Sequence, residues 1–156
     1  MFVVGSANCD DGKCNRGEIM CPSLGTATDW ANAGDFSYQS KIYGNALIFH
    51  QGYFYTFAGH NENGAIRQVG RVAENGGYIG SWSIAGSLNS VRYGHRAIWS
   101  RAYNQGAFLV IGGQGDQPTE QCQLFGSQMV CVNQKPLAEN FHFWPELFNV
   151  PATFCK

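Results

Sequence analysis

Short apolar runs that end in small residues recur along this chain. Residues 1–6 (MFVVGS), 53–59 (YFYTFAG) and 107–113 (AFLVIGG) share this pattern, and their small residues at positions 5, 58 and 112 stand 53 and 54 residues apart. Runs of this length, rich in β-branched and aromatic residues, predict β-strands. Their return at a nearly constant step predicts a repeated structural unit.

A second element precedes two of these runs. Residues 43–49 (YGNALIF) correspond to residues 93–99 (YGHRAIW), and this alignment places Gly44 opposite Gly94. Both segments carry apolar residues after the glycine, and they predict the strand that leads into each apolar run.

A third element follows the runs. Residues 14–21 (CNRGEIMC) correspond to residues 122–131 (CQLFGSQMVC). The middle copy has residues 71–80 in this place, with Asn75-Gly76 as a strong hairpin signal. One unit therefore reads as a four-stranded antiparallel meander of about fifty residues, and units of this kind form the blades of β-propellers.

The copy around residue 100 resembles a kelch repeat. It has Arg92, Gly94 and His95 at an Arg-x-Gly-His start, the doublet Gly112-Gly113 at the end of the second strand, and Trp82 ten residues before the arginine. The middle copy departs from this pattern, with Ile42, Asn45 and Ala58 in place of the arginine, the histidine and the first glycine.

The resemblance implies an all-β fold, with antiparallel four-stranded meanders arranged as blades of a partial kelch-type β-propeller. We expect His95 to hydrogen-bond inside its own blade, and small residues to stand where a Cβ would clash near the propeller axis. The residues to which we assign a structural role in the repeat are Gly44, Gly59, Trp82, Arg92, Gly94, His95, Gly112 and Gly113.

The repeat divides the chain into about three blades. We interpret residues 1–156 as a single partial propeller domain, with a blade remainder at 1–34, blades at 35–90 and 91–138, and the start of a further blade at 139–156. Propellers close with four to eight blades. The chain is therefore expected to be a fragment, a mis-started gene model, or a protein that completes the ring through missing blades or self-association.

The spacing of the cysteines suggests two cross-strand disulfides. If Cys14 faces Cys21 and Cys122 faces Cys131, each hairpin turn falls on a Gly-X pair, which suits a two-residue loop. Reduced structural thiols and a zinc site are the alternatives, and the spacings do not resemble a zinc motif. Disulfides favour an extracellular or secreted location over a cytoplasmic one. The pairing of Cys9 and Cys155 stays open.

Composition narrows the classes of function. The net charge is −1 and charged residues make up 13% of the chain, which does not suit a nucleic-acid surface. No apolar stretch is long enough for a membrane helix, and the first residues lack the basic segment of a signal peptide. We predict no nucleic-acid partner and no membrane insertion.

Motifs for chemistry are sparse. The chain has no nucleophile elbow and no P-loop, and its four histidines lack helical metal-ligand spacing. We predict no catalytic residues, no metal site and no cofactor. Arg67 and His60, which follow the second-strand terminus, and Arg71 are candidate binding residues, because guanidinium groups suit carboxylate recognition. A solvated blade edge is the competing interpretation.

The favoured function is a non-enzymatic, extracellular kelch-type binding module for protein or glycan partners. One alternative is a fragment of a kelch-propeller enzyme, either an oxidase or a sugar-modifying protein, with its active residues at the channel mouth. Another is a cytosolic kelch substrate adaptor, which the paired cysteines disfavour.

Overall fold

All regular elements that the structure describes are β-strands, so the expected all-β class is confirmed. The structure is a computed structural model that describes residues 2–4, 16–19, 31–35, 42–75, 78–101, 106–114 and 117–135. A small three-stranded sheet contains β1 (Phe2–Val4), β2 (Arg16–Ile19) and β3 (Ala31–Asp35). In the described part of the chain, no helix is long and apolar enough to cross a membrane.

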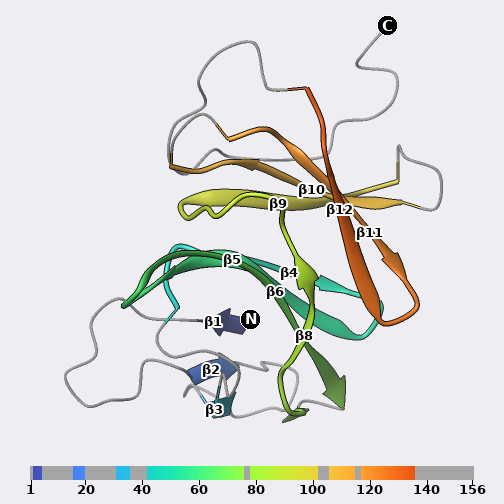
Figure 1. Cartoon of the computed structure of the whole chain (residues 1–156). Helices are drawn as coiled ribbons and strands as arrows, with labels where there is room; N and C mark the ends of the chain where they lie inside the picture. The colour runs from blue at the N-terminus through green and yellow to red at the C-terminus, as the bar shows by residue number, and fades with distance from the viewer. Residues whose placement is uncertain are drawn as a thin grey trace, which may run out of the picture.

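Two four-stranded units form the main body (Figure 1). The first unit contains β4 (Ala46–His50), β5 (Tyr53–Asn61), β6 (Gly64–Asn75) and β8 (Ser83–Ser87), and the two-residue β7 (Tyr78–Ile79) pairs with β6. The second unit contains β9 (His95–Ser100), β10 (Ala107–Gly112), β11 (Glu120–Phe125) and β12 (Gln128–Asn133).

The eight strands follow the order β4-β5-β6-β8-β12-β11-β10-β9 in one nearly closed, barrel-like sheet. Neighbours are antiparallel within each unit, and the units join where β8 and β12 pair in parallel at Gly86 and Met129. A Cβ on Gly86 would overlap the carbonyl oxygen of Met129, so a glycine is required at this contact. The arrangement is compatible with a propeller-like all-β fold.

The backbone repeats as the sequence alignment predicts. The aligned glycines Gly44 and Gly94 have φ angles of 64° and 67°. The small residues that end the second strand of each unit also share a positive φ: 46° at Ala58, 71° at Gly112, 122° at Gly59 and 107° at Gly113. The two units therefore have the same backbone conformation at these aligned positions.

The fourth strand of the first unit differs from the expectation. The hairpin signal is real, because Asn75 pairs with Tyr78 and Glu74 with Ile79. The strand after this turn is only two residues long, however, and β8 supplies the fourth strand of the sheet by pairing with β6 at Gln68–Arg71. The meander of this unit thus contains β7 as a short additional strand between β6 and β8.

The hydrophobic core lies between the two units. Its first-unit side comes from residues of β4, β5, β6 and β8 and from Leu88 after β8, and its second-unit side from Phe108, Val110, Cys122 and Met129. Phe108 is central, with its ring 5.2 Å from that of Tyr55 and 5.3 Å from that of Phe57. Burying these aromatic rings supplies much of the stabilisation that holds the units together.

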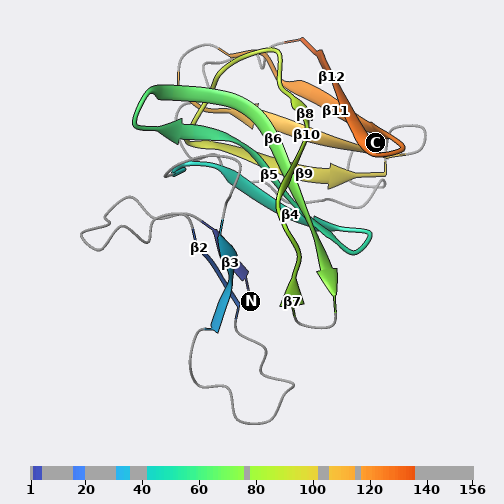
Figure 2. The same cartoon turned by 60° about the horizontal axis from the view of Figure 1, so that its bottom comes forward.

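The small sheet, the first unit and the second unit form three successive layers in both views (Figure 2). The small sheet β1-β2-β3 lies on the side of the first unit that faces away from the second unit. The expected Cys14–Cys21 disulfide, the thiols of Cys9 and Cys155, and the further blade at 139–156 lie outside the described residues.

Candidate functional site

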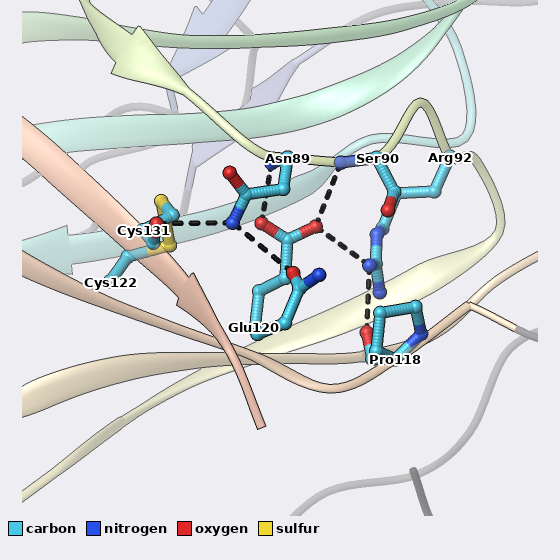
Figure 3. The surroundings of a disulfide bond; sticks show 8 residues. Asn89, Ser90, Arg92, Pro118, Glu120, Cys122 and Cys131 are labelled. Carbon is cyan, nitrogen blue, oxygen red and sulfur yellow. Dashed lines mark hydrogen bonds and ion pairs between the residues drawn. A yellow bond between two sulfur atoms is a disulfide. The ribbon is translucent and has the colours of Figure 1, made fainter. Parts of the chain in front are cut away.

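A buried ion pair joins the linker between the units to the second unit. Arg92 donates from Nη2 to Glu120 Oε1 at 2.8 Å, and both side chains have no exposed surface (Figure 3). The guanidinium also donates to the carbonyls of Gly112 at 3.2 Å and Pro118 at 2.8 Å. Burial lowers the pKa of Arg92, and the charge and hydrogen bond of Glu120 act in the opposite direction.

The carboxylate of Glu120 also accepts two backbone hydrogen bonds from this linker. The N–H of Asn89 donates at 2.6 Å and that of Ser90 at 3.1 Å. The side-chain amide of Asn89 continues to the carbonyl of Cys131 at 3.0 Å. With its oxygens satisfied in this way, Glu120 fixes the path of the chain between the units, and its place in the core is structural.

His95 makes its hydrogen bond to the other unit. Its Nε2 lies 2.9 Å from the carbonyl oxygen of Phe57, so the contact crosses the interface instead of staying inside one blade as expected. Burial, followed by the positive charge of Arg92, lowers the pKa of His95 to about 3. The ring is therefore neutral at physiological pH, and Nε2 carries the proton that it donates.

The glycines that end the second strands, Gly59 and Gly113, stand where chain segments meet closely. A Cβ on Gly59 would lie 2.8 Å from Cγ2 of Ile42, and one on Gly113 would lie 3.0 Å from the carbonyl oxygen of Tyr93. The crowding comes from the segments that lead into β4 and β9. Trp82 is 5% exposed and lies before β8.

Cys122 and Cys131 form a disulfide directly across the β11–β12 hairpin. Their Cα atoms are 4.0 Å apart, and the residues are register partners. Phe125 pairs with Gln128, so the two-residue turn falls on Gly126-Ser127 as predicted, with φ of 62° at Gly126.

A groove opens at the end of the interface where two hairpin turns face each other. It has a volume of about 450 Å³ and receives residues from both units. The β4–β5 turn is formed by Gln51 and Gly52, which both have positive φ, at 49° and 77°. This combination suits a type I′ turn, and it holds Gln51 at the groove. The lining residues are Gln51, Tyr53, Tyr55, Arg71, Leu124, Gly126 and Ser127.

Arg71 is the cationic group of this groove. Its guanidinium carbon lies 5.1 Å from the ring centroid of Tyr53, within the range of a cation–π contact. Arg71 pairs across the strands with Tyr55. Burial raises the pKa of the Tyr55 hydroxyl, and the charge and hydrogen bond of Arg71 counteract this effect. Both tyrosines thus help to hold the guanidinium in place.

A second, smaller cavity of about 150 Å³ shares Gln51 and Leu124 with the groove. Here the ring of His50 lies 3.7 Å from that of Trp99. Burial, followed by the charge of Arg101, lowers the pKa of His50. Its buried Nε2 has no hydrogen-bond partner among the described residues. His50 is thus a polar group beside the groove that sequence reasoning did not identify.

The three candidate binding residues do not form one site. Arg71 lies opposite Tyr55, whereas His60 lies opposite Ala65, near the far end of β5. The His60 ring is located between Tyr43 and Tyr93, with centroid distances of 4.8 and 5.0 Å. Arg67 is exposed on β6. Only Arg71 of the three lines a cavity described above.

The groove could not be found from the sequence, because its residues come from separate parts of two units. The type of residue offers one signal, since two tyrosines and an arginine alternate on facing positions of β5 and β6. In the described residues, no group of three or more His, Cys, Asp or Glu side chains could hold a metal ion. No protein-family model matches the chain, and no curated protein matches it in sequence.

Proposed function

We propose that the chain is a non-enzymatic binding module of kelch-like design, which takes protein or glycan partners in an extracellular setting. The observation that carries the proposal is the inter-unit groove, where Tyr53 and Tyr55 hold Arg71 beside the β4–β5 and β11–β12 turns. A positioned guanidinium beside aromatic rings suits a ligand that carries a carboxylate next to a flat or apolar face.

The chemistry of the lining favours recognition. The Gln51 amide and the Ser127 hydroxyl both donate and accept hydrogen bonds, and the Tyr53 ring offers an apolar face. A uronic acid in a glycan and an acidic side chain in a peptide share the carboxylate that these groups would bind. The turns at the rim are short, so little ordering is required when a ligand enters.

Binding can be tested with two probes on one set of variants. Oligogalacturonide and a glutamate-rich peptide are titrated into the chain by calorimetry, with the Arg71→Gln, Arg71→Lys and Arg67→Gln variants in parallel. We expect Arg71→Gln to weaken binding about tenfold or more, because a charge-assisted hydrogen bond contributes about 1.5–3 kcal/mol. The affinity of Arg71→Lys should lie between those of the unaltered chain and Arg71→Gln, since lysine keeps the charge without the planar guanidinium.

Arg67→Gln is the matched control, because Arg67 is exposed on the same strand and does not line the groove. It should leave the affinity unchanged. The proposal would be wrong if neither probe bound, or if both arginine positions had equal effects. Preference for one probe decides between a glycan and a protein partner.

The extracellular setting is supported by the Cys122–Cys131 disulfide, which is compatible with an oxidising compartment. Mass measurement of protein taken directly from its source, alkylated before and after reduction, tests this part. Free thiols at these two positions would instead favour the cytosolic adaptor.

A further inference from the structure

The two units pack against each other with opposite faces. The first unit contributes His50, Tyr55 and Phe57 to the interface, and these rings contact Trp99 and Phe108 of the second unit. The packing is therefore head-to-tail, since the aromatic residues that meet there are not equivalent in the repeat. A head-to-tail contact leaves one face of each unit available for the same contact again.

The repeat identifies the residues on these two remaining faces. In the register of β4 with β5 and of β9 with β10, Phe49 and Phe54 are the counterparts of Trp99 and Phe108. The rings of both pairs are in contact, with centroids 4.8 Å apart in the first unit and 4.7 Å apart in the second. The second unit places its aromatic pair in the interface. The first unit carries the corresponding pair on its other side, away from the interface.

The second unit has a matching acceptor face. Leu109 pairs with Gln121 as Tyr55 pairs with Arg71 in the first unit, so Leu109 occupies the position of a core residue. On the same face, Val132 lies opposite Gln121 and Val130 opposite Gln123. We call this the outer face, and its exposed apolar side chains are Phe125, Val130 and Val132.

Exposed apolar side chains gather on these two faces. Among the described residues, six large apolar side chains are exposed, and five of them lie on one face or the other. Phe125, Val130 and Val132 are 59%, 50% and 50% exposed on the outer face. Phe49 and Ile84 are 54% and 60% exposed on the opposite side of the molecule, which we call the donor face. The small sheet β1-β2-β3 lies on that side and leaves both exposed.

We propose that the outer face binds the donor face of a second copy of this chain, and so repeats the contact between the two units from one molecule to the next. The interface would bury the exposed Phe49 and Ile84 of one copy against β9–β12 of its neighbour. Association of this kind extends to a closed ring or to an open chain, depending on the rotation between copies. Apolar surfaces that alternate along strands, as these do, are expected to be covered.

The test compares two variants that each disable one face. Val130→Lys/Val132→Lys alters the outer face, and Phe49→Lys/Ile84→Lys alters the donor face. Asn63→Lys/Gln114→Lys adds the same charge at exposed sites outside both faces. Sedimentation velocity and light scattering follow the mass of each protein over a wide range of concentrations. Circular dichroism and the intact Cys122–Cys131 bond confirm that each variant is folded, and Ile84→Lys alone replaces the double variant if Phe49→Lys disturbs Phe54.

We expect the unaltered chain and the control to form multiples of the monomer mass, and each face variant alone to be monomeric. An equimolar mixture of the two face variants should form a dimer and nothing larger, because one intact face of each kind remains. Each variant should raise the apparent dissociation constant about tenfold or more. A monomeric unaltered chain would overturn the proposal, as would a donor-face variant that still dimerises by itself or a mixture that stays monomeric.

Discussion

Gly94 donates its backbone N–H to the carbonyl oxygen of Gly44 at 2.8 Å, so two glycines that occupy the same place in the repeat contact each other. Their φ angles differ by only a few degrees, at 64° and 67°. A Cβ on Gly44 would lie 3.3 Å from the Gly94 nitrogen. The entry segments of the two units therefore meet where the eight-stranded sheet comes closest to closing.

Replacing Gly59 should destabilise the fold through close approach of neighbouring atoms as well as through backbone conformation. Gly59→Ala and Gly64→Ala both place a side chain at nearly the same φ, 122° and 119°, and this cost is about 1–3 kcal/mol. Only the Cβ on Gly59 would meet Ile42, whereas the position of Gly64 is open. We expect Gly59→Ala to lower the free energy of unfolding by about 1 kcal/mol more than Gly64→Ala does, as measured by urea denaturation. Equal losses would show that packing at Gly59 is unimportant.

Removing one partner of the buried ion pair should be costly. Glu120→Gln leaves the Arg92 guanidinium buried without its counter-charge and weakens the hydrogen bonds from the linker. The free energy of unfolding should fall by about 3 kcal/mol or more. Arg67→Gln, at an exposed arginine, should change it by less than about 0.5 kcal/mol. Chemical denaturation of the three proteins checks this, and a loss below 1 kcal/mol for Glu120→Gln would contradict the assigned role.

Stability should decline in mild acid because of His95. Its pKa is lowered to about 3 in the folded state, while an unfolded histidine binds a proton near pH 6.5. The unfolded state therefore binds more protons below pH 6.5, and stability is full above this pH and is lost as the pH falls toward 3. The slope from His95 approaches about 1.4 kcal/mol per pH unit.

His95→Gln separates this effect from other titrations. The amide can still donate to the Phe57 carbonyl, but it does not bind a proton in this range. Between pH 6.5 and 4.5, the free energy of unfolding of the variant should depend less steeply on pH. The difference should correspond to nearly one proton, as measured by thermal or urea unfolding. His50, whose pKa is also lowered, should account for part of the remaining slope. An unchanged slope would mean that His95 is not buried as neutral imidazole.

The hairpin disulfide should contribute modestly to stability. It closes a loop with a sequence separation of 9 residues, and the chain-entropy relation gives about 2–3 kcal/mol for a loop of this size. Cys122→Ala/Cys131→Ala should lower the free energy of unfolding by about this amount or somewhat more, because Cys122 is also a buried core residue whose truncation removes packing. Peptide mapping of the oxidised protein should recover Cys122 and Cys131 in one linked fragment. Recovery of both as free thiols would contradict the assignment.

Much of the architecture follows from local patterns in the sequence. Apolar runs at 53–59 and 107–113 predicted strands, and the structure has β5 at Tyr53–Asn61 and β10 at Ala107–Gly112. Gly126-Ser127 between two cysteines predicted the hairpin and its disulfide, because a two-residue turn fixes the register of the strands beside it. The doublets of small residues were found by their spacing, and their positive φ angles repeat as the spacing implies.

Long-range partners were not predictable in this way. Glu120 and Arg92 are 28 residues apart, and nothing near either residue indicates the other. His95 was expected to bond within its blade, but the stacking of two units brings the Phe57 carbonyl to it. Arg67 and His60 were chosen for their position after the second strand and Arg71 for its guanidinium, and strand register then separated the three.

The sequence by itself determined that the chain forms repeated antiparallel strands, where the turns after β6 and β11 lie, and which cysteines face each other across β11 and β12. These features depend on backbone sterics and on side-chain alternation, which act over a few residues. Only the tertiary structure decided which face of each unit is buried, where the groove opens, and that Arg92, Glu120 and His95 hold the interface. Those outcomes depend on how two sheets pack, and packing is set by the shapes of side chains far apart in the sequence.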